Sequence, residues 1–291
     1  MRHWPFRISV SSLPPEIRLL PKALKKFNRD HAFLLSSGIA FALLGCLIPL
    51  ILLAFALVGT YLLDHEELLD YIGQYLKSMF PAFDPQIMEN LLSIIRDRKI
   101  YGLIGLAGLL WTSTWVFTSL RGALNIVFGV SKGRSLLRGK MIDLLLILLG
   151  GTFLLASMAL TWALGFIQQY EIRFPLDLGP IFSFFLRYLL PFLFTFWMFF
   201  LIYKIAPNKQ IPLQIALKTA FFTSLGWETA KQLFGWYVLH LGRFSAVYGS
   251  LGTAAILFFW TYYSAAILLF GGEMAALLEQ ETDGEGRRDA P

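Results

Sequence analysis

The sequence is short of charge. Asp, Glu, Lys and Arg together make up 15% of its 291 residues, against about 25% in an average soluble domain. Hydrophobic residues make up 56%, which is more apolar surface than a single globular core can hide. The composition therefore argues against a soluble protein, and it predicts an all-α protein that crosses a membrane several times.

Cysteine and histidine are also scarce. Cys46 is the only cysteine, so an intrachain disulfide and a cysteine-rich metal cluster are excluded. The four histidines are scattered and never stand at the spacing of metal ligands. No P-loop, Ser/His/Asp arrangement or HExxH motif is present. We therefore expect no metal, no cofactor and no catalytic residues.

Charge disappears over six stretches that are long enough to cross a bilayer, which takes about 20 residues of α-helix. The predicted spans are 32–63, 100–120, 144–166, 181–206, 213–235 and 244–272. They form a predicted bundle of six transmembrane helices, with a membrane domain over 32–278. A basic segment at 1–31 precedes this domain, and a charged tail at 279–291 follows it; we expect the tail to be disordered.

Lysine and arginine are concentrated on one side of the predicted bundle. They gather in the N-terminal segment, between the second and third spans, around the turn between the fourth and fifth spans, and in the tail. The positive-inside rule places this side in the cytoplasm. We therefore expect both termini in the cytoplasm, with the basic side against an anionic inner leaflet.

Two segments outside the spans have the periodicity of amphipathic helices. In 10–30, apolar residues at helical spacing oppose a basic face, which predicts an interfacial helix, with a disordered basic tail as the alternative. The apolar residues of this stripe are Ile17, Leu20, Leu24 and Phe27. Residues 64–99 predict an external amphipathic helical hairpin over the bundle, with either a functional or a purely structural role.

The fifth span carries the most informative polar residues. Ser224, Glu228 and Gln232 recur every four residues and share one helix face, and Lys231 is close enough to reach Glu228. Ionisable groups at membrane depth usually face a cavity or a partner. We hypothesise that these four residues line a substrate or ion path. A packing role for Glu228, or a Lys231 that extends to the interface, is the alternative. Glu273 lies near the end of the sixth span, where we expect its charge to be solvated at the membrane interface.

Two further sets of residues concern the backbone and helix packing. Pro49 lies within the first span, four residues after Gly45, and predicts a kink or a locally opened helix. Small residues recur at the start of the sixth span and predict close contact between helices. They are Ser245, Gly249, Gly252 and Thr253.

Several motifs stand in a distinctive order along the chain. They are IPLILL at 48–53, RGALNIVFGV at 121–130, FFLIYKIAPN at 199–208, GWETAKQLFGWYV at 226–238, and VYGSLGTAAILFFWTYYSAAILLFGGEMAALLE at 247–279. Together they resemble the YihY/BrkB family of bacterial inner-membrane proteins. The motif positions that we single out are Asn125, Tyr203, Pro207, Asn208, Trp227, Tyr248 and Glu273. The chain departs from the family at Phe41 and Gly45, where a tyrosine and a serine are usual.

The resemblance implies a six-helix protein of a bacterial inner membrane whose biochemical role is not settled; some members were once labelled ribonuclease BN. We favour a transporter or permease-like function. A non-transporting scaffold or envelope assembly factor is the alternative. A ribonuclease is the least favoured function, because the predicted cytoplasmic loops contain almost no acids or histidines for acid–base chemistry. We expect no specific nucleic-acid partner, and a homo-oligomer stays open.

Overall fold

The computed structural model describes most of the helical parts of the chain. The described residues are 15–62, 97–130, 189–241 and 244–288, with short pieces between 139 and 149. Every element in the long described ranges is an α-helix, which confirms the predicted all-α class. The chain divides into two compact units, one formed by Phe41–Val116 and the other by Met1–Ala40 with Phe117–Pro291.

An interrupted helix characterises the first predicted span. Helix α2 (Ala32–Gly45) ends immediately before Cys46, and α3 (Leu47–Leu62) begins immediately after it. Pro49 has no N–H group, so the carbonyl of Gly45, four residues earlier, loses its helical hydrogen bond. The interruption therefore lies between the two residues that the sequence analysis singled out for a helix break.

Within the unit Phe41–Val116, α3 packs closely on α6 (Arg98–Val127). Gly102, Gly105 and Gly108 form a stripe along α6 that faces α3. A Cβ atom added to Gly105 would lie 2.9 Å from the backbone nitrogen of Leu53 and 3.1 Å from the carbonyl oxygen of Pro49. Glycine is therefore required for this approach, as in other close helix pairs in membranes.

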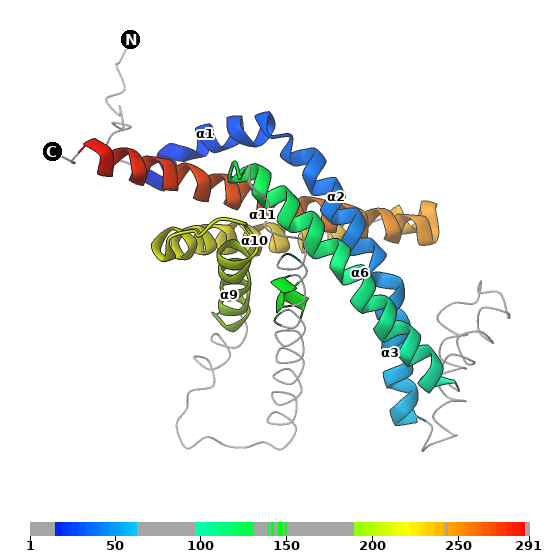
Figure 1. Cartoon of the computed structure of the whole chain (residues 1–291). Coiled ribbons are helices and arrows are strands. Elements are labelled where there is room, and N and C mark those ends of the chain that lie inside the picture. Colours follow the sequence, from blue (N-terminus) through cyan, green and yellow to red (C-terminus); the bar gives the residue numbers. More distant parts are fainter. Residues whose placement is uncertain are drawn as a thin grey trace, which may run out of the picture. The chain divides into compact units, whose positions relative to one another are not determined.

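The second unit contains the remaining helices. Helix α1 (Pro15–Arg29) packs on α11 (Phe244–Arg288), and α10 (Leu213–Leu241) packs on both α11 and α9 (Leu190–Ile205). Figure 1 shows α1, in blue, beside the red C-terminal part of α11. The residues discussed as a candidate site all lie in this unit.

Three helices in the described ranges are long and apolar enough to cross a membrane. They are Ala32–Leu57, Arg98–Val127 and Ala254–Thr282, and α9 is a shorter apolar helix. These helices overlap the first, second, sixth and fourth predicted spans, which supports a helical membrane protein. The third predicted span and the external hairpin lie outside the described residues, apart from short pieces, so the six-span arrangement stays a prediction.

Helix α10 covers the fifth predicted span but differs from the other span helices. Its 29 residues are long enough to cross a bilayer, yet it is not among the candidate spans. Lys218, Glu228 and Lys231 interrupt its apolar sequence.

The C-terminal tail corrects one prediction. Helix α11 continues to Arg288, so the segment predicted to be disordered is helical over most of its length. Two of its carboxylates are partnered: Lys209 Nζ lies 2.7 Å from Glu279 Oε2, and Lys22 Nζ lies 3.3 Å from Glu281 Oε1. The sequence analysis expected a charged tail to be disordered, whereas two of its carboxylates are paired with lysines of other segments.

Candidate functional site

A buried ion pair joins α1 to α11. Lys26 donates a hydrogen bond from Nζ to Oε2 of Glu273, and the two side chains are 8% and 0% exposed. The same ammonium group donates to Oδ2 of Asp30 at 2.7 Å and to the backbone carbonyl of Val127 at 2.6 Å. A single buried cation is therefore satisfied by three groups, from the turn that follows α1, from α6 and from α11.

The position of Lys26 follows from the buried face of α1. Leu19, Ala23 and Lys26 are spaced at four and three residues, so they share one side of the helix, and all three are buried. In the predicted apolar stripe, Phe27 is buried, whereas Leu20 and Leu24 are exposed. The buried face therefore overlaps the predicted one only in part, and it contains a lysine that the sequence analysis counted only as part of a basic segment.

Glu273 is a second correction. We expected solvation at the membrane interface, but the side chain is fully buried inside the protein. Its Oε1 atom is buried without a hydrogen-bond partner among the described residues. An isolated buried carboxylate is strongly disfavoured, so Lys26 is the group that allows a charged glutamate here. Sequence periodicity carried no sign of this contact between distant segments.

The C-terminal end of α6 completes the surroundings of Lys26. Gly129 has a φ angle of +62°, and the N–H of Val130 donates to the carbonyl of Asn125 at 2.8 Å, which is the pattern of a glycine C-cap. The carbonyl of Val127 is left free of the helix and accepts from Lys26. A cation is favoured at this position because the end of a helix carries partial negative charge.

The turn between α9 and α10 is fixed to the same region by two of the family-motif positions. Asn125 accepts a hydrogen bond at its Oδ1 atom from the backbone N–H of Asn208 at 2.8 Å. Pro207 is fully buried, and Lys209 forms its ion pair with Glu279. Asn125 and Asn208 thus meet in space beside the ion pair of Lys209 with Glu279 of α11, although they are 83 residues apart in the sequence.

A layer of hydroxyl groups joins α9, α10 and α11. Tyr203 is fully buried, donates to the carbonyl of Leu268 at 2.7 Å, and lies 3.1 Å from Oγ1 of Thr223. A Cβ atom on Gly271 would collide with the hydroxyls of both Tyr203 and Thr223. We call Tyr203, Thr223 and Gly271 the hydroxyl layer; the sequence analysis singled out only Tyr203 among them.

The predicted polar face of α10 lies further along the same helix. Lys231 Nζ lies 2.5 Å from Glu228 Oε2, and these side chains are 37% and 20% exposed. Thr195 of α9, which the sequence analysis missed, donates to Glu228 Oε1 at 3.2 Å. Ser224 is fully buried, and its hydroxyl has no partner among the described residues. Gln232 is exposed at the other end of this face.

Two of the remaining predicted residues, Trp227 and Gly252, lie where helices pack. Trp227 stacks edge to face against Phe199 and Trp260, with ring centroids 5.8 and 5.4 Å apart. Gly252 is buried in α11. The backbone of α11 includes four further predicted positions whose side chains lie outside the described part: Ser245, Tyr248, Gly249 and Thr253.

Asp30 gives the site a testable dependence on pH. Burial raises the pKa of Asp30, but hydrogen bonds from Lys26 and Arg29 outweigh burial and hold the pKa below its usual value of 3.8. A carboxyl group whose pKa is lower in the folded than in the unfolded protein stabilises the fold at a pH above its unfolded-state pKa. This stabilisation is lost as the pH falls through the folded-state pKa. We expect Asp30→Asn to lower the melting temperature in detergent by about 2–4 °C near neutral pH. The difference from the unsubstituted protein should shrink below about pH 4; a difference that grows with acidity would contradict this account.

Comparisons with known proteins agree with the membrane character of the chain. A family model described as virulence factor BrkB matches residues 23–291. A UPF0761 membrane protein of Glaesserella parasuis serovar 5 is 29% identical over 199 residues, covering 68% of this chain and 69% of the relative. A UPF0761 membrane protein of Haemophilus influenzae is 22% identical over 256 residues, covering 88% and 93%. A Bacillus subtilis protein named as ribonuclease-like, YfkH, is 26% identical over 260 residues, covering 84% and 89%. No solved structure matches.

Proposed function

The chain belongs to the virulence factor BrkB family of membrane proteins, and from this premise we propose that it is a permease-like transporter. Its substrate or ion path passes the pair formed by Glu228 and Lys231 in α10. The pair is partly exposed and lies within the fifth predicted span. An ionisable pair at membrane depth is costly unless it faces a cavity or a partner.

Incompletely satisfied polar groups on α10 and α11 are the observation that supports this proposal most strongly. The hydroxyls of Ser224 on α10 and Ser264 on α11 are buried without partners among the described residues, and Oε1 of Glu273, further along α11, is buried without a partner too. Buried polar groups in native proteins are almost always hydrogen-bonded, to protein or to water. Groups left without partners along packed helices are suited to meeting water, an ion or a polar substrate.

The hydroxyl layer is the proposed barrier along this path. On α10, Glu228 lies five residues after Thr223, which is about 7–8 Å along the helix axis. Helix α11 runs in the opposite direction to α10, and on it Glu273 lies two residues after Gly271. The polar pair and the buried Lys26–Glu273 pair therefore lie on opposite sides of the layer. We propose that small movements of α9 against α10 and α11 expose Glu228 alternately to the two sides of the membrane.

Recordings of charge movement test the transport function. Proteoliposomes on a solid-supported membrane would be exposed to pools of anionic, cationic and neutral solutes under an inward proton gradient. We expect at least one pool to evoke a current that Glu228→Gln abolishes. Thr229→Val is the matched control, because Thr229 is exposed on the same helix and bonds only to its own turn. No current in the unsubstituted protein, or a current that survives Glu228→Gln, would contradict the proposal and favour a scaffold or assembly factor.

We also propose that the chain is not a nuclease, although the relative YfkH is named as ribonuclease-like. Acid–base cleavage of RNA needs titratable groups at a site that RNA can reach. In the described ranges, Glu273 is buried against Lys26, and no three His, Cys, Asp or Glu side chains are grouped to hold a metal ion. Cleavage of RNA by the purified protein, lost on a defined point substitution, would overturn this proposal.

The basic residues of α1 support a proposed orientation of the protein in a bacterial inner membrane. The solvent-exposed residues of α1 include Lys22, Lys25 and Arg29, and basic residues are enriched on the cytoplasmic side of membrane proteins. We propose that α1 and the C-terminal end of α11 lie at the cytoplasmic surface, with these basic residues facing an anionic leaflet.

A further inference from the structure

The carboxylate of Glu228 has a different partner at each of its two oxygen atoms. Lys231, three residues further along α10, places its Nζ atom 2.5 Å from Oε2. Thr195 of α9 donates its hydroxyl proton to Oε1 at 3.2 Å. One partner is therefore a cation of the same helix and the other is a neutral hydroxyl of the neighbouring helix, so the two respond differently when the charge of Glu228 changes.

The hydroxyl of Thr195 has one proton and two acceptors within reach. Its Oγ1 atom lies 2.9 Å from the carbonyl oxygen of Pro191, one turn earlier in α9, and 3.2 Å from Oε1 of Glu228. A hydroxyl donates one hydrogen bond and can also accept. When Thr195 gives its proton to Pro191, its oxygen can accept a hydrogen bond from Glu228. Thr195 can therefore bond to Glu228 in two ways without displacement of either oxygen atom.

The two ways correspond to the two protonation states of Glu228. A charged carboxylate can only accept, so Thr195 then donates to Oε1. A protonated carboxyl carries an O–H donor, and Thr195 then accepts from it while its own proton turns to the carbonyl of Pro191. An ammonium group at this position would serve only the charged form. The hydroxyl keeps Glu228 hydrogen-bonded to α9 whether or not Glu228 carries a proton.

Lys231 distinguishes the two states. Its ammonium group favours the charged carboxylate at this distance, and it loses its anion when Glu228 is protonated. The Lys231 side chain is 37% exposed and has a long flexible stem, so it can extend to the membrane interface. The ion pair and the extended lysine, which the sequence left open as alternatives, then become two states of one site.

The other charged side chains of the helices that pack together here lie away from Glu228. Lys204 is nine residues after Thr195 on α9, and Lys218 is ten residues before Glu228 on α10, which is about 13–15 Å along either helix. Lys204 donates to the carbonyl of Ile211. Helix α11 carries no charged residue from Phe244 to Gly272. Lys231 is therefore the charge that opposes proton binding at Glu228.

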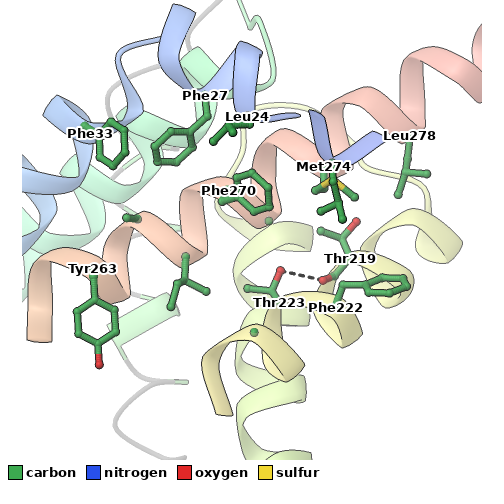
Figure 2. Close-up of a pocket in the computed structure, with 15 residues that line it drawn as sticks. Leu24, Phe27, Phe33, Thr219, Phe222, Thr223, Tyr263, Phe270, Met274 and Leu278 are labelled. Carbon is green, nitrogen blue, oxygen red and sulfur yellow. Dashed lines mark hydrogen bonds between the residues drawn. The ribbon is translucent and has the colours of Figure 1, made fainter. Parts of the chain in front are cut away.

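Two tyrosines are the titratable side chains that contact α10 from the neighbouring helices. Tyr203 of α9 belongs to the hydroxyl layer and donates to the carbonyl of Leu268. Tyr263 of α11 lies against Phe234 of α10 and lines an apolar cavity beside it (Figure 2). A phenol in water loses its proton only near about pH 10, so both tyrosines stay neutral while a carboxyl group changes its charge.

A metal cation suits this site less well than a proton. A bound Ca²⁺ takes about six to eight oxygen ligands, and among the described residues no three His, Cys, Asp or Glu side chains are grouped to hold a metal ion. The ammonium group at Oε2 also repels a second cation. A proton needs only a lone pair of Oε1 and an acceptor, and Oγ1 of Thr195 supplies the acceptor.

We propose that Glu228 is a proton-binding site and that Thr195 is its positioning residue, which donates to the charged carboxylate and accepts from the protonated carboxyl. The proton comes from water and binds Oε1, while Lys231 stays an ammonium ion and extends away. Return of the proton to water restores the ion pair. The inference rests on the proposed path through α10, and it names the proton as the coupling ion of that path.

Infrared difference spectra of the purified protein in vesicles, taken between alkaline and acidic pH without any transported solute, test the site. Protonation produces the C=O stretching band of a carboxyl group, and we expect one component of this band to be absent from Glu228→Gln. Thr195→Val should move that component to higher frequency, because the protonated carboxyl then lacks its acceptor, and Thr195→Ser should return it. Thr261→Val is the matched control, because Thr261 donates only to carbonyls of its own helix; it should leave the component unchanged.

A spectrum without a component that depends on Glu228, or a component that Thr195→Val does not move, would overturn the inference. The current recordings described above separate this failure from a failure of the transport function. A Glu228 component without a current from any solute pool would support proton binding and contradict transport. A current that Glu228→Gln abolishes, without a Glu228 component, would keep the path and overturn proton binding.

Discussion

Replacing Glu273 by leucine is expected to destabilise the protein by about 3–5 kcal/mol, because it leaves the buried ammonium of Lys26 without its main anion. Lys26 is 8% exposed and cannot turn to water without moving α1. Lys26 keeps Asp30 and the carbonyl of Val127 as partners. The expected loss of stability is therefore no larger than that of breaking one buried ion pair. The melting temperature in detergent should fall by roughly 10 °C.

A second Lys–Glu pair between the same two helices provides the control. Lys22 and Glu281 are 66% and 43% exposed, and an exposed pair contributes at most about 1 kcal/mol. Glu281→Leu should therefore change the melting temperature little. The double variant Lys26→Leu/Glu273→Leu should recover much of the stability lost by Glu273→Leu, because no charge is then left unpaired. Equal effects of Glu273→Leu and Glu281→Leu would contradict the buried pair.

Replacing Gly271 by alanine is expected to cost about 2–4 kcal/mol, through overpacking and the loss of a buried hydrogen bond. The added Cβ would strike the hydroxyls of Tyr203 and Thr223, and Tyr203 is fully buried with no room to withdraw. Its hydrogen bond to the carbonyl of Leu268 would be stretched or broken. Thermal unfolding monitored by intrinsic fluorescence measures the loss.

The same helices offer a control and a rescue for Gly271→Ala. Gly226→Ala adds a methyl group where no atom lies within 4 Å, and it should stabilise α10 by up to about 1 kcal/mol through helix propensity. Combining Gly271→Ala with Tyr203→Phe and Thr223→Ala removes both obstructing hydroxyls. The combined effect should then be smaller than the sum of the separate effects, because the residues are in contact. Strict additivity would show that the hydroxyl layer is not the obstacle.

Local periodicity predicted the contacts that lie within one helix. Glu228 and Lys231 are three residues apart, so their ion pair follows from helix geometry, and the structure forms it. The helix break in the first span followed equally from the missing N–H of Pro49. In both cases the physical cause lies within a few residues of the sequence.

Contacts between distant segments could not be predicted in this way. Lys26 and Glu273 are separated by 247 residues, and no periodicity links them. The resemblance to a known family singled out Glu273 as a motif position without giving its partner. The helical tail was missed for the same reason, because Glu279 and Glu281 are stabilised by lysines far away in the chain. A charge that looks solvated in sequence can be paired in the fold.

Water access to the polar face of α10 is the most direct test of the transport account. In membrane vesicles of the Cys46→Ala protein, single cysteines are introduced through 221–235 and treated from each side with a membrane-impermeant thiol reagent. We expect labelling at positions 224, 228 and 232, and protection at positions 225 and 229, which belong to another face of the helix. Protection of positions 224, 228 and 232 from both sides would show that Glu228 is sealed in helix packing, and it would contradict a path through α10.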